Sequence, residues 1–134
     1  KGVFKRVNVG FGYSYVLPVI VAAVMAKKGS LLIIENPEAH LHPAAQSRLM
    51  KFLIDTTMKK DLQLIVESHS DHVVNGMRIA MKDKIMSPTK GHIVYFSDEE
   101  DDPVQVITSD ANGTLSDYPD DFMDEWTAQM LKLV

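Results

Sequence analysis

Apolar and polar positions along the chain follow two different periods, which predict strands and helices in turn. Residues 30–35 read SLLIIE and are apolar on both faces, as is typical of a strand inside a parallel sheet. From Pro43 onward, PAAQSRLMKFLIDTTMKK repeats apolar residues at helical spacing, which predicts an amphipathic helix that begins at this proline. A second apolar run at 62–67 (LQLIVE) precedes a third predicted helix over 71–82. This order is that of a βαβ unit, so we expect the two strands to be parallel.

A long apolar helix is predicted ahead of the first strand. Residues 10–14 (GFGYS) are interpreted as a glycine-bearing loop, and residues 15–26 (YVLPVIVAAVMA) are almost wholly apolar. Proline is tolerated only in the first turn of a helix, so Pro18 predicts a helix start at 14–17, and Gly29 predicts its end. The apolar run is shorter than the ~20 residues of a membrane span, which favours a buried helix.

The last third of the chain has a different pattern. Residues 92–97 (HIVYFS) and 103–108 (PVQVIT) alternate in polarity, which predicts a β-hairpin at a sheet edge. The pair Asn112-Gly113 predicts a turn, and residues 118–133 predict a closing helix. The expected fold class is therefore α/β, with parallel strands and flanking helices followed by a C-terminal β-hairpin and helix.

Composition narrows the classes of protein to which this chain can belong. Its 134 residues suffice for one domain with one core. The net charge of -4 disfavours nucleic-acid binding by this piece alone. No cysteine occurs, which predicts a reducing, cytoplasmic compartment without disulfides or thiolate metal sites. Because the chain begins at Lys1 without an initiator methionine, we expect a piece of a longer protein.

Polar residues follow both predicted strands at the point where each strand ends. Glu35 ends the first strand and is followed by NPEAHLH, and Glu67 ends the second and is followed by SHSDH. The carboxyl ends of parallel strands meet at one edge of a sheet, where ligands bind, so the two loops predict one site. An apolar strand that ends in a carboxylate is the Walker B arrangement, although such a pattern is more often a strand meeting solvent.

Four motifs together resemble those of cassette-class (ABC) P-loop ATPases. Residues 8–14 (NVGFGYS) are similar to the signature loop, 31–35 to Walker B, 39–42 (AHLH) to the D-loop and 68–71 (SHSD) to the H-loop. The chain resembles more narrowly the chromosome-maintenance-like branch, which includes the overcoming-lysogenization nucleases and the AAA15/AAA21 predicted ATPases. The tail, SDANGTLSDYPDDFMDEW, resembles the small domain of unknown function that follows such ATPases.

This resemblance implies roles for the matching residues. Glu35 takes the position that coordinates Mg²⁺, and His69 takes the position that contacts the terminal phosphate of ATP. Five residues of the signature-like loop take positions that face a phosphate bound by a partner subunit: Gly10, Phe11, Gly12, Tyr13 and Ser14.

Two residues compete for the role beside the attacking water. Asn36 falls where transporters carry the catalytic glutamate, but its amide can only orient water. Pro37 favours an extended backbone at Asn36, so that Asn36 and Glu38 would point to the same side. Glu38 is then the substitute candidate for the general base. The alternative for Glu38 is a cap on the helix that begins at Pro43, or simple exposure to solvent.

The resemblance implies a partial P-loop NTPase that binds and hydrolyses ATP as a homodimer, with DNA or a nuclease as partner in DNA repair or anti-phage defence and no membrane contact. No GxxxxGKS or GxxxxGKT motif occurs, so the Walker A loop would come from a missing N-terminal half or from another chain. We expect residues 1–97 to be the C-terminal part of the ATPase domain and residues 98–134 to be a family-specific extension.

Two other classes of function stay open at this point. A non-catalytic dimerisation or docking module could use the acidic runs at 98–102 and 117–124. A Zn²⁺- or Mn²⁺-dependent hydrolase would need several His and carboxylate side chains to converge. The residues available for that are His40, His42, His69, His72, Glu35, Glu38 and Asp71.

Overall fold

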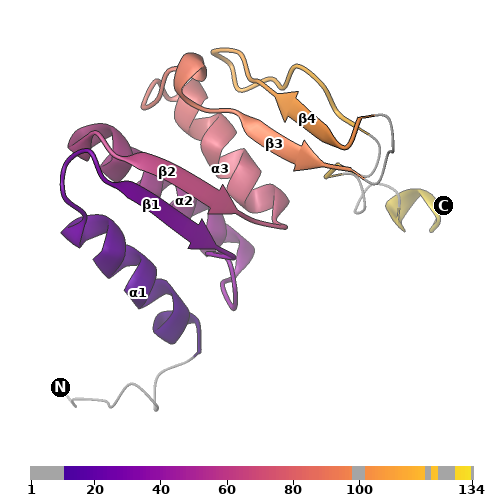
Figure 1. Ribbon diagram of the computed structural model, residues 1–134. Helices are drawn as coiled ribbons and strands as arrows, with labels where there is room; N and C mark the ends of the chain where they lie inside the picture. The colour runs from indigo at the N-terminus through magenta and orange to yellow at the C-terminus, as the bar shows by residue number, and fades with distance from the viewer. Residues whose placement is uncertain (1–10, 98–101, 120–121, 124–128, 134) are drawn as a thin grey trace.

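The computed structural model of the protein describes residues 11–97, 102–119, 122–123 and 129–133 (Figure 1). Its elements in chain order are α1 (Phe11–Met25), β1 (Leu31–Glu35), α2 (Pro43–Lys60), β2 (Gln63–Glu67), α3 (Asp71–Lys82), the short 3-10 helix η2 (Pro88–Lys90), β3 (Ile93–Phe96) and β4 (Val104–Ile107).

The centre of the fold is the predicted βαβ unit. Strands β1 and β2 pair in parallel, with Leu31 opposite Gln63 and Glu35 opposite Glu67. Helix α2 connects the two strands, and α3 follows β2 and packs along α2. The prediction of both strands, both helices and their parallel order is confirmed, and the fold is the α/β arrangement of a partial P-loop NTPase.

Within the described part of the chain, helices cover one face of the β1–β2 sheet, whereas the sequence predicted two buried faces. Ile34 points toward the helices and is 7% exposed in a cluster with Ala23 of α1 and Leu53 of α2. On the opposite face, Ile33 and Ile65 are 61% and 54% exposed. The reason is that α1, α2 and α3 all pack against the same side of the sheet (Figure 1).

Helix α1 begins at Phe11, so the prediction of a loop through Ser14 and of a later helix start is wrong. Pro18 lies inside the helix, where it has no N–H to donate. Packing of the following turns against β1 and α2, through Ile20 and Ala23, offsets that loss. The side chain of Lys60 donates to the carbonyls of Val24 and Ala26. These hydrogen bonds supply partners for carbonyl groups at the C-terminal end of α1.

Helices α2 and α3 approach closely at Gly76. A Cβ built on Gly76 would lie 2.9 Å from Cβ of Met50 and 3.0 Å from the carbonyl oxygen of Ser47. Neither atom can move without shifting the backbone of α2. The glycine therefore sets how close α3 lies to α2, and with it the position of the loop that precedes α3.

The substitution Gly76→Ala is expected to destabilise the protein by about 1 kcal/mol. Alanine improves helix propensity by about 1 kcal/mol, but overpacking of this kind costs about 1–3 kcal/mol. Chemical denaturation of both proteins, followed by circular dichroism, measures the difference in free energy of unfolding. An unchanged or raised midpoint would contradict the close approach of the two helices.

The C-terminal third forms the predicted hairpin, in which β3 and β4 are antiparallel and Ile93 lies opposite Ile107. Among the described strands this hairpin is a separate sheet beside α3, so it does not extend the β1–β2 sheet as an edge (Figure 1). Ile107 is 1% exposed and clusters with Leu115 and Phe122, and Val74 of α3 packs against them.

The predicted turn at Asn112-Gly113 is confirmed. The carboxylate of Asp110 accepts the backbone N–H groups of Asn112 and Thr114, both at 2.8 Å, and Gly113 has a φ of 77°. The hydrogen bond from Thr114 lowers the pKa of Asp110 below its usual value of 3.8, and the one from Asn112 acts in the same direction. Arg78 of α3 donates to the carbonyl of Gly113 at 2.6 Å, which holds the turn against α3.

The predicted helix over 118–133 is wrong in its first part. Residues 118–119 and 122–123 are not helical, and residues 129–131 are. Phe122 turns inward instead and packs edge-on against Tyr95, with ring centroids 5.2 Å apart. In the part of the chain that the structure describes, no helix combines the length and the apolar character needed to cross a membrane.

Candidate functional site

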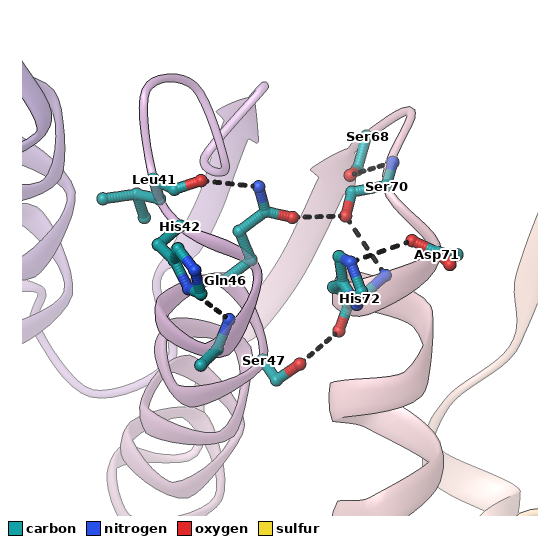
Figure 2. Close-up of polar contacts among 9 residues, drawn as sticks. Leu41, His42, Gln46, Ser47, Ser68, Ser70, Asp71 and His72 are labelled. Atoms are coloured by element: carbon teal, nitrogen blue, oxygen red, sulfur yellow. Dashed lines mark hydrogen bonds and ion pairs between the residues drawn. The ribbon is translucent and has the colours of Figure 1, made fainter.

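The loops that follow β1 and β2 meet at one edge of the sheet, as predicted. The backbone N–H of Asn36 donates to the carbonyl of Glu67 at 3.0 Å, which extends the β1–β2 pairing by one step into the loops. Residues 36–42 form the first loop, and residues 68–70 form the second (Figure 2). Side chains from both loops therefore share one small region above the strand ends.

The backbone of the first loop is not extended at Asn36, which corrects the prediction from Pro37. Asn36 has a φ of 46°, in the left-handed region that asparagine tolerates better than most residues. Its carbonyl accepts the N–H of Ala39 at 3.1 Å, so that buried Pro37 lies inside a turn. The argument that placed Asn36 and Glu38 side by side on an extended strand is thus wrong.

Glu38 links the two loops through its carboxylate. Its Oε1 accepts the backbone N–H of His69 at 3.1 Å, while its Oε2 is buried without a hydrogen-bond partner. The alternative of a cap on α2 is wrong, because α2 is capped by His42, whose Nδ1 accepts from Ala44 at 3.4 Å. Glu38 is half-buried, with Oε2 turned away from solvent. An ionised carboxylate oxygen can only accept hydrogen bonds, so Oε2 of Glu38 could accept one from a bound molecule.

Gln46 makes a second link between the loops, which the sequence analysis missed. Its amide nitrogen donates to the carbonyl of Leu41 at 2.9 Å, and its oxygen accepts the hydroxyl of Ser70 at 2.6 Å (Figure 2). The hydroxyl of Ser70 accepts the N–H of His72 at 3.1 Å and so caps α3. The only sequence signal was a polar residue at an early position of an amphipathic helix.

Charged side chains lie exposed around these links. Glu35 is exposed at the end of β1. Glu67, which the sequence analysis did not select, holds the imidazole of His69, with Oε1 3.1 Å from Nε2. The side chain of His69 is 85% exposed, which leaves it free to contact a bound molecule. The sequence did contain a signal for Glu67, because this residue ends the second predicted strand just as Glu35 ends the first.

The described part of the signature-like segment lies beside the first loop. A Cβ on Gly12 would lie 2.9 Å from the carbonyl oxygen of His40, so only glycine allows this approach. The rings of Tyr15 and His40 pack with centroids 4.6 Å apart. Tyr13 is 70% exposed on the outside of α1. Gly10, the first residue predicted for ATP binding, lies outside the described residues.

The side chains proposed for a Zn²⁺ or Mn²⁺ hydrolase do not converge. Within the described residues, no group of three or more His, Asp and Glu side chains is arranged to hold a metal ion. The imidazole of His69 pairs with the carboxylate of Glu67 instead, and Nε2 of His72 lies 3.6 Å from Oδ1 of Asp71. The arrangement predicted for this alternative is therefore wrong.

Comparison with protein families agrees with this architecture. The family described as "AAA domain, putative AbiEii toxin, Type IV TA system" matches residues 4–75, and a protein family of unknown function (DUF3696) matches residues 87–133. No curated protein and no solved structure gives a significant match to the chain. The first match covers the βαβ unit, both loops and the start of α3. The matched residues make up more than half of the 134 residues of the chain. The chain therefore belongs to this family of P-loop ATPase-like AAA domains.

Proposed function

We propose that the chain supplies one half of an ATP-hydrolysing site of the cassette class. The observation that carries the proposal is the link between the two loops, in which Glu38 Oε1 accepts the N–H of His69 at 3.1 Å. This bond brings the Walker B-like strand end and the H-loop-like segment together. Membership of the AAA family supports a nucleotide as the ligand.

The residues at the strand ends fit a magnesium ion. Magnesium sites use one or two carboxylates together with water and substrate phosphates, and do not need a cage of protein ligands. Glu35 is an exposed carboxylate at the right place, and Glu67 lies opposite it in the pairing. When bound there, Mg²⁺ would neutralise charge on the phosphate oxygens.

The other roles follow from the contacts of each side chain. Glu38 is our candidate for the general base, because its Oε2 is buried and has no hydrogen-bond partner. Asn36 is exposed and can orient water beside it. His69 contacts the terminal phosphate, and Glu67 orients its imidazole through the 3.1 Å contact.

In our proposal, the Walker A loop and the signature-like residues complete the site, and both lie outside the two loops after β1 and β2. Walker A is supplied by a preceding half of the protein or by another chain, and Gly12, Tyr13 and Ser14 face a nucleotide bound by a second copy. The complete ATPase acts as a homodimer, and DNA repair or anti-phage defence with a nuclease is the process it drives. Residues 1–97 belong to the ATPase domain, and residues 98–134 form the extension.

One observation favours a second candidate function, a non-catalytic docking module. The open face of the β1–β2 sheet exposes apolar side chains that a partner would cover, among them Leu31, Ile33 and Ile65, which are 51%, 61% and 54% exposed. A full-length protein that dimerises but does not bind nucleotide would favour this candidate.

The substitution Glu35→Gln in the full-length protein is expected to raise the Mg²⁺ concentration for half-maximal ATP turnover about tenfold. The amide keeps the shape but removes the charge that holds the ion, and a tenfold loss corresponds to about 1.4 kcal/mol of binding free energy. A titration of ATP turnover with Mg²⁺ measures the effect. An unchanged Mg²⁺ dependence would remove Glu35 from the metal site, and absence of any turnover in the unsubstituted protein would contradict the proposed function.

A further inference from the structure

We propose that Gln46 is a positioning residue that holds the loop after β2 in place against the loop after β1. The inference rests on the proposed function in one respect, because it assigns that arrangement to ATP turnover. It goes beyond the motif residues, since Gln46 belongs to none of the four ATPase-like motifs and does not reach the strand ends itself.

The amide group of Gln46 is matched to its two partners. It donates to the backbone carbonyl of Leu41 at 2.9 Å and accepts the hydroxyl of Ser70 at 2.6 Å, and both contacts are partly buried. A side-chain amide offers both a donor and an acceptor at this reach without a charge. A carboxylate would face the Leu41 carbonyl with a second acceptor, and an apolar side chain would leave both partners unsatisfied.

The effect of Gln46 reaches His69 through Ser70. The hydroxyl of Ser70 accepts the N–H of His72 and so fixes the first turn of α3 directly after His69. His69 itself is tied to the first loop by the Glu38 carboxylate. The loop that carries His69 is therefore held at two points, by Gln46 through Ser70 and by Glu38.

The position of α2 makes Gln46 a suitable anchor for both loops. Helix α2 begins directly after the first loop, and Gln46 lies in its first turns, opposite the start of α3 (Figure 2). Ser47 adds a parallel contact, as its hydroxyl donates to the carbonyl of His72 at 3.1 Å. A rigid helix thus sets the spacing between two loops that have no common strand or helix.

The substitution Gln46→Leu separates this role from a general loss of stability. In the full-length protein we expect kcat for ATP to fall by about tenfold to a hundredfold, with KM changed by less than about threefold, because misplacement of a catalytic group affects the reaction more than ground-state binding. Amide exchange at His69 and His72 is expected to become about fivefold faster, the factor that corresponds to one net hydrogen bond.

Three further variants complete the experiment. Ser70→Ala should reproduce the effect, Ser70→Thr should restore most of kcat because it keeps the hydroxyl, and the double variant Gln46→Leu with Ser70→Ala should be no worse than the more damaging single variant. Gln63→Leu is the matched control, since Gln63 is exposed at the opposite end of β2, and its kcat should equal that of the unsubstituted protein.

The exchange measurement keeps this inference distinct from the proposed function. Unchanged exchange at His69 and His72 in Gln46→Leu would overturn the inference whatever the turnover. Faster exchange with unchanged kcat would overturn the positioning role in an active ATPase. Faster exchange in a protein that hydrolyses no ATP even without substitution would support the link between the loops and contradict the proposed function instead.

Discussion

Replacing Glu38 with glutamine is expected to lower ATP turnover of the full-length protein by about 10²- to 10⁴-fold, the contribution of a general base. Glutamine keeps the shape of the side chain, and its oxygen can still accept the His69 N–H that Glu38 Oε1 accepts at 3.1 Å. It loses only the second carboxylate oxygen, which in Glu38 is buried without a partner. Turnover at saturating ATP and Mg²⁺ measures the effect.

This substitution distinguishes chemistry from architecture at Glu38. If the residue only held the two loops together, Glu38→Gln would retain turnover and Glu38→Ala would lose it. If it is the base, both variants lose turnover, and only Glu38→Ala also speeds amide exchange at His69. Full turnover in Glu38→Gln would therefore remove Glu38 from the catalytic step.

Asn36 provides the competing explanation and has its own variant. Its φ of 46° makes alanine a strained replacement, so Asn36→Gly removes the side chain while it preserves the backbone. We expect a smaller loss of turnover than in Glu38→Gln, about tenfold, because an amide can orient water but cannot accept its proton. Loss in Asn36→Gly together with full turnover in Glu38→Gln would transfer the role beside the water to Asn36.

The elements that were predicted correctly depend on local sequence. The apolar runs that end at Glu35 and Glu67 and the helical spacing after Pro43 are readable within a few residues. The parallel pairing then follows from the order of these elements. As a result, the meeting of Glu35 and Glu67 at one edge could be inferred without any structure.

The features that were missed depend on contacts between distant parts of the chain. Glu38 and His69 are 31 residues apart, and Gln46 and Ser70 are 24 apart, so no local pattern shows their hydrogen bonds. Gly12, near the start of α1, likewise fits against the carbonyl of His40, which lies far away in the sequence. At Pro18, packing of α1 against β1 and α2 outweighs the local preference of proline, and at Pro37 a turn replaces the extended backbone that proline favours.

The same distinction explains the open face of the sheet. An apolar strand predicts that both faces can be buried, but it does not say which helices will cover them. In the described chain, Leu32, Ile34 and Leu64 meet α1 and α2, while Ile33 and Ile65 have no such layer. The buried residues that pack against the β1–β2 sheet therefore lie on its helical side, while a separate cluster around Ile107 lies under the hairpin.

Replacing Leu53 with alanine is accordingly expected to destabilise the protein by about 2–5 kcal/mol, which is the usual cost of a buried leucine and the cavity it leaves. Leu53 is 1% exposed and packs where α1, α2 and β1 meet, with Ala23, Ile34 and Leu49 around it. Leu131→Ala is the matched control, because Leu131 is 74% exposed, and a surface change of this kind alters stability by no more than about 0.5 kcal/mol. Equal midpoints of urea denaturation for the two variants would contradict a core on the helical side of the sheet. A large loss of stability in Leu53→Ala alone would show that the contact between α1 and α2 supports β1. The same contact would then support Glu35 at the end of β1.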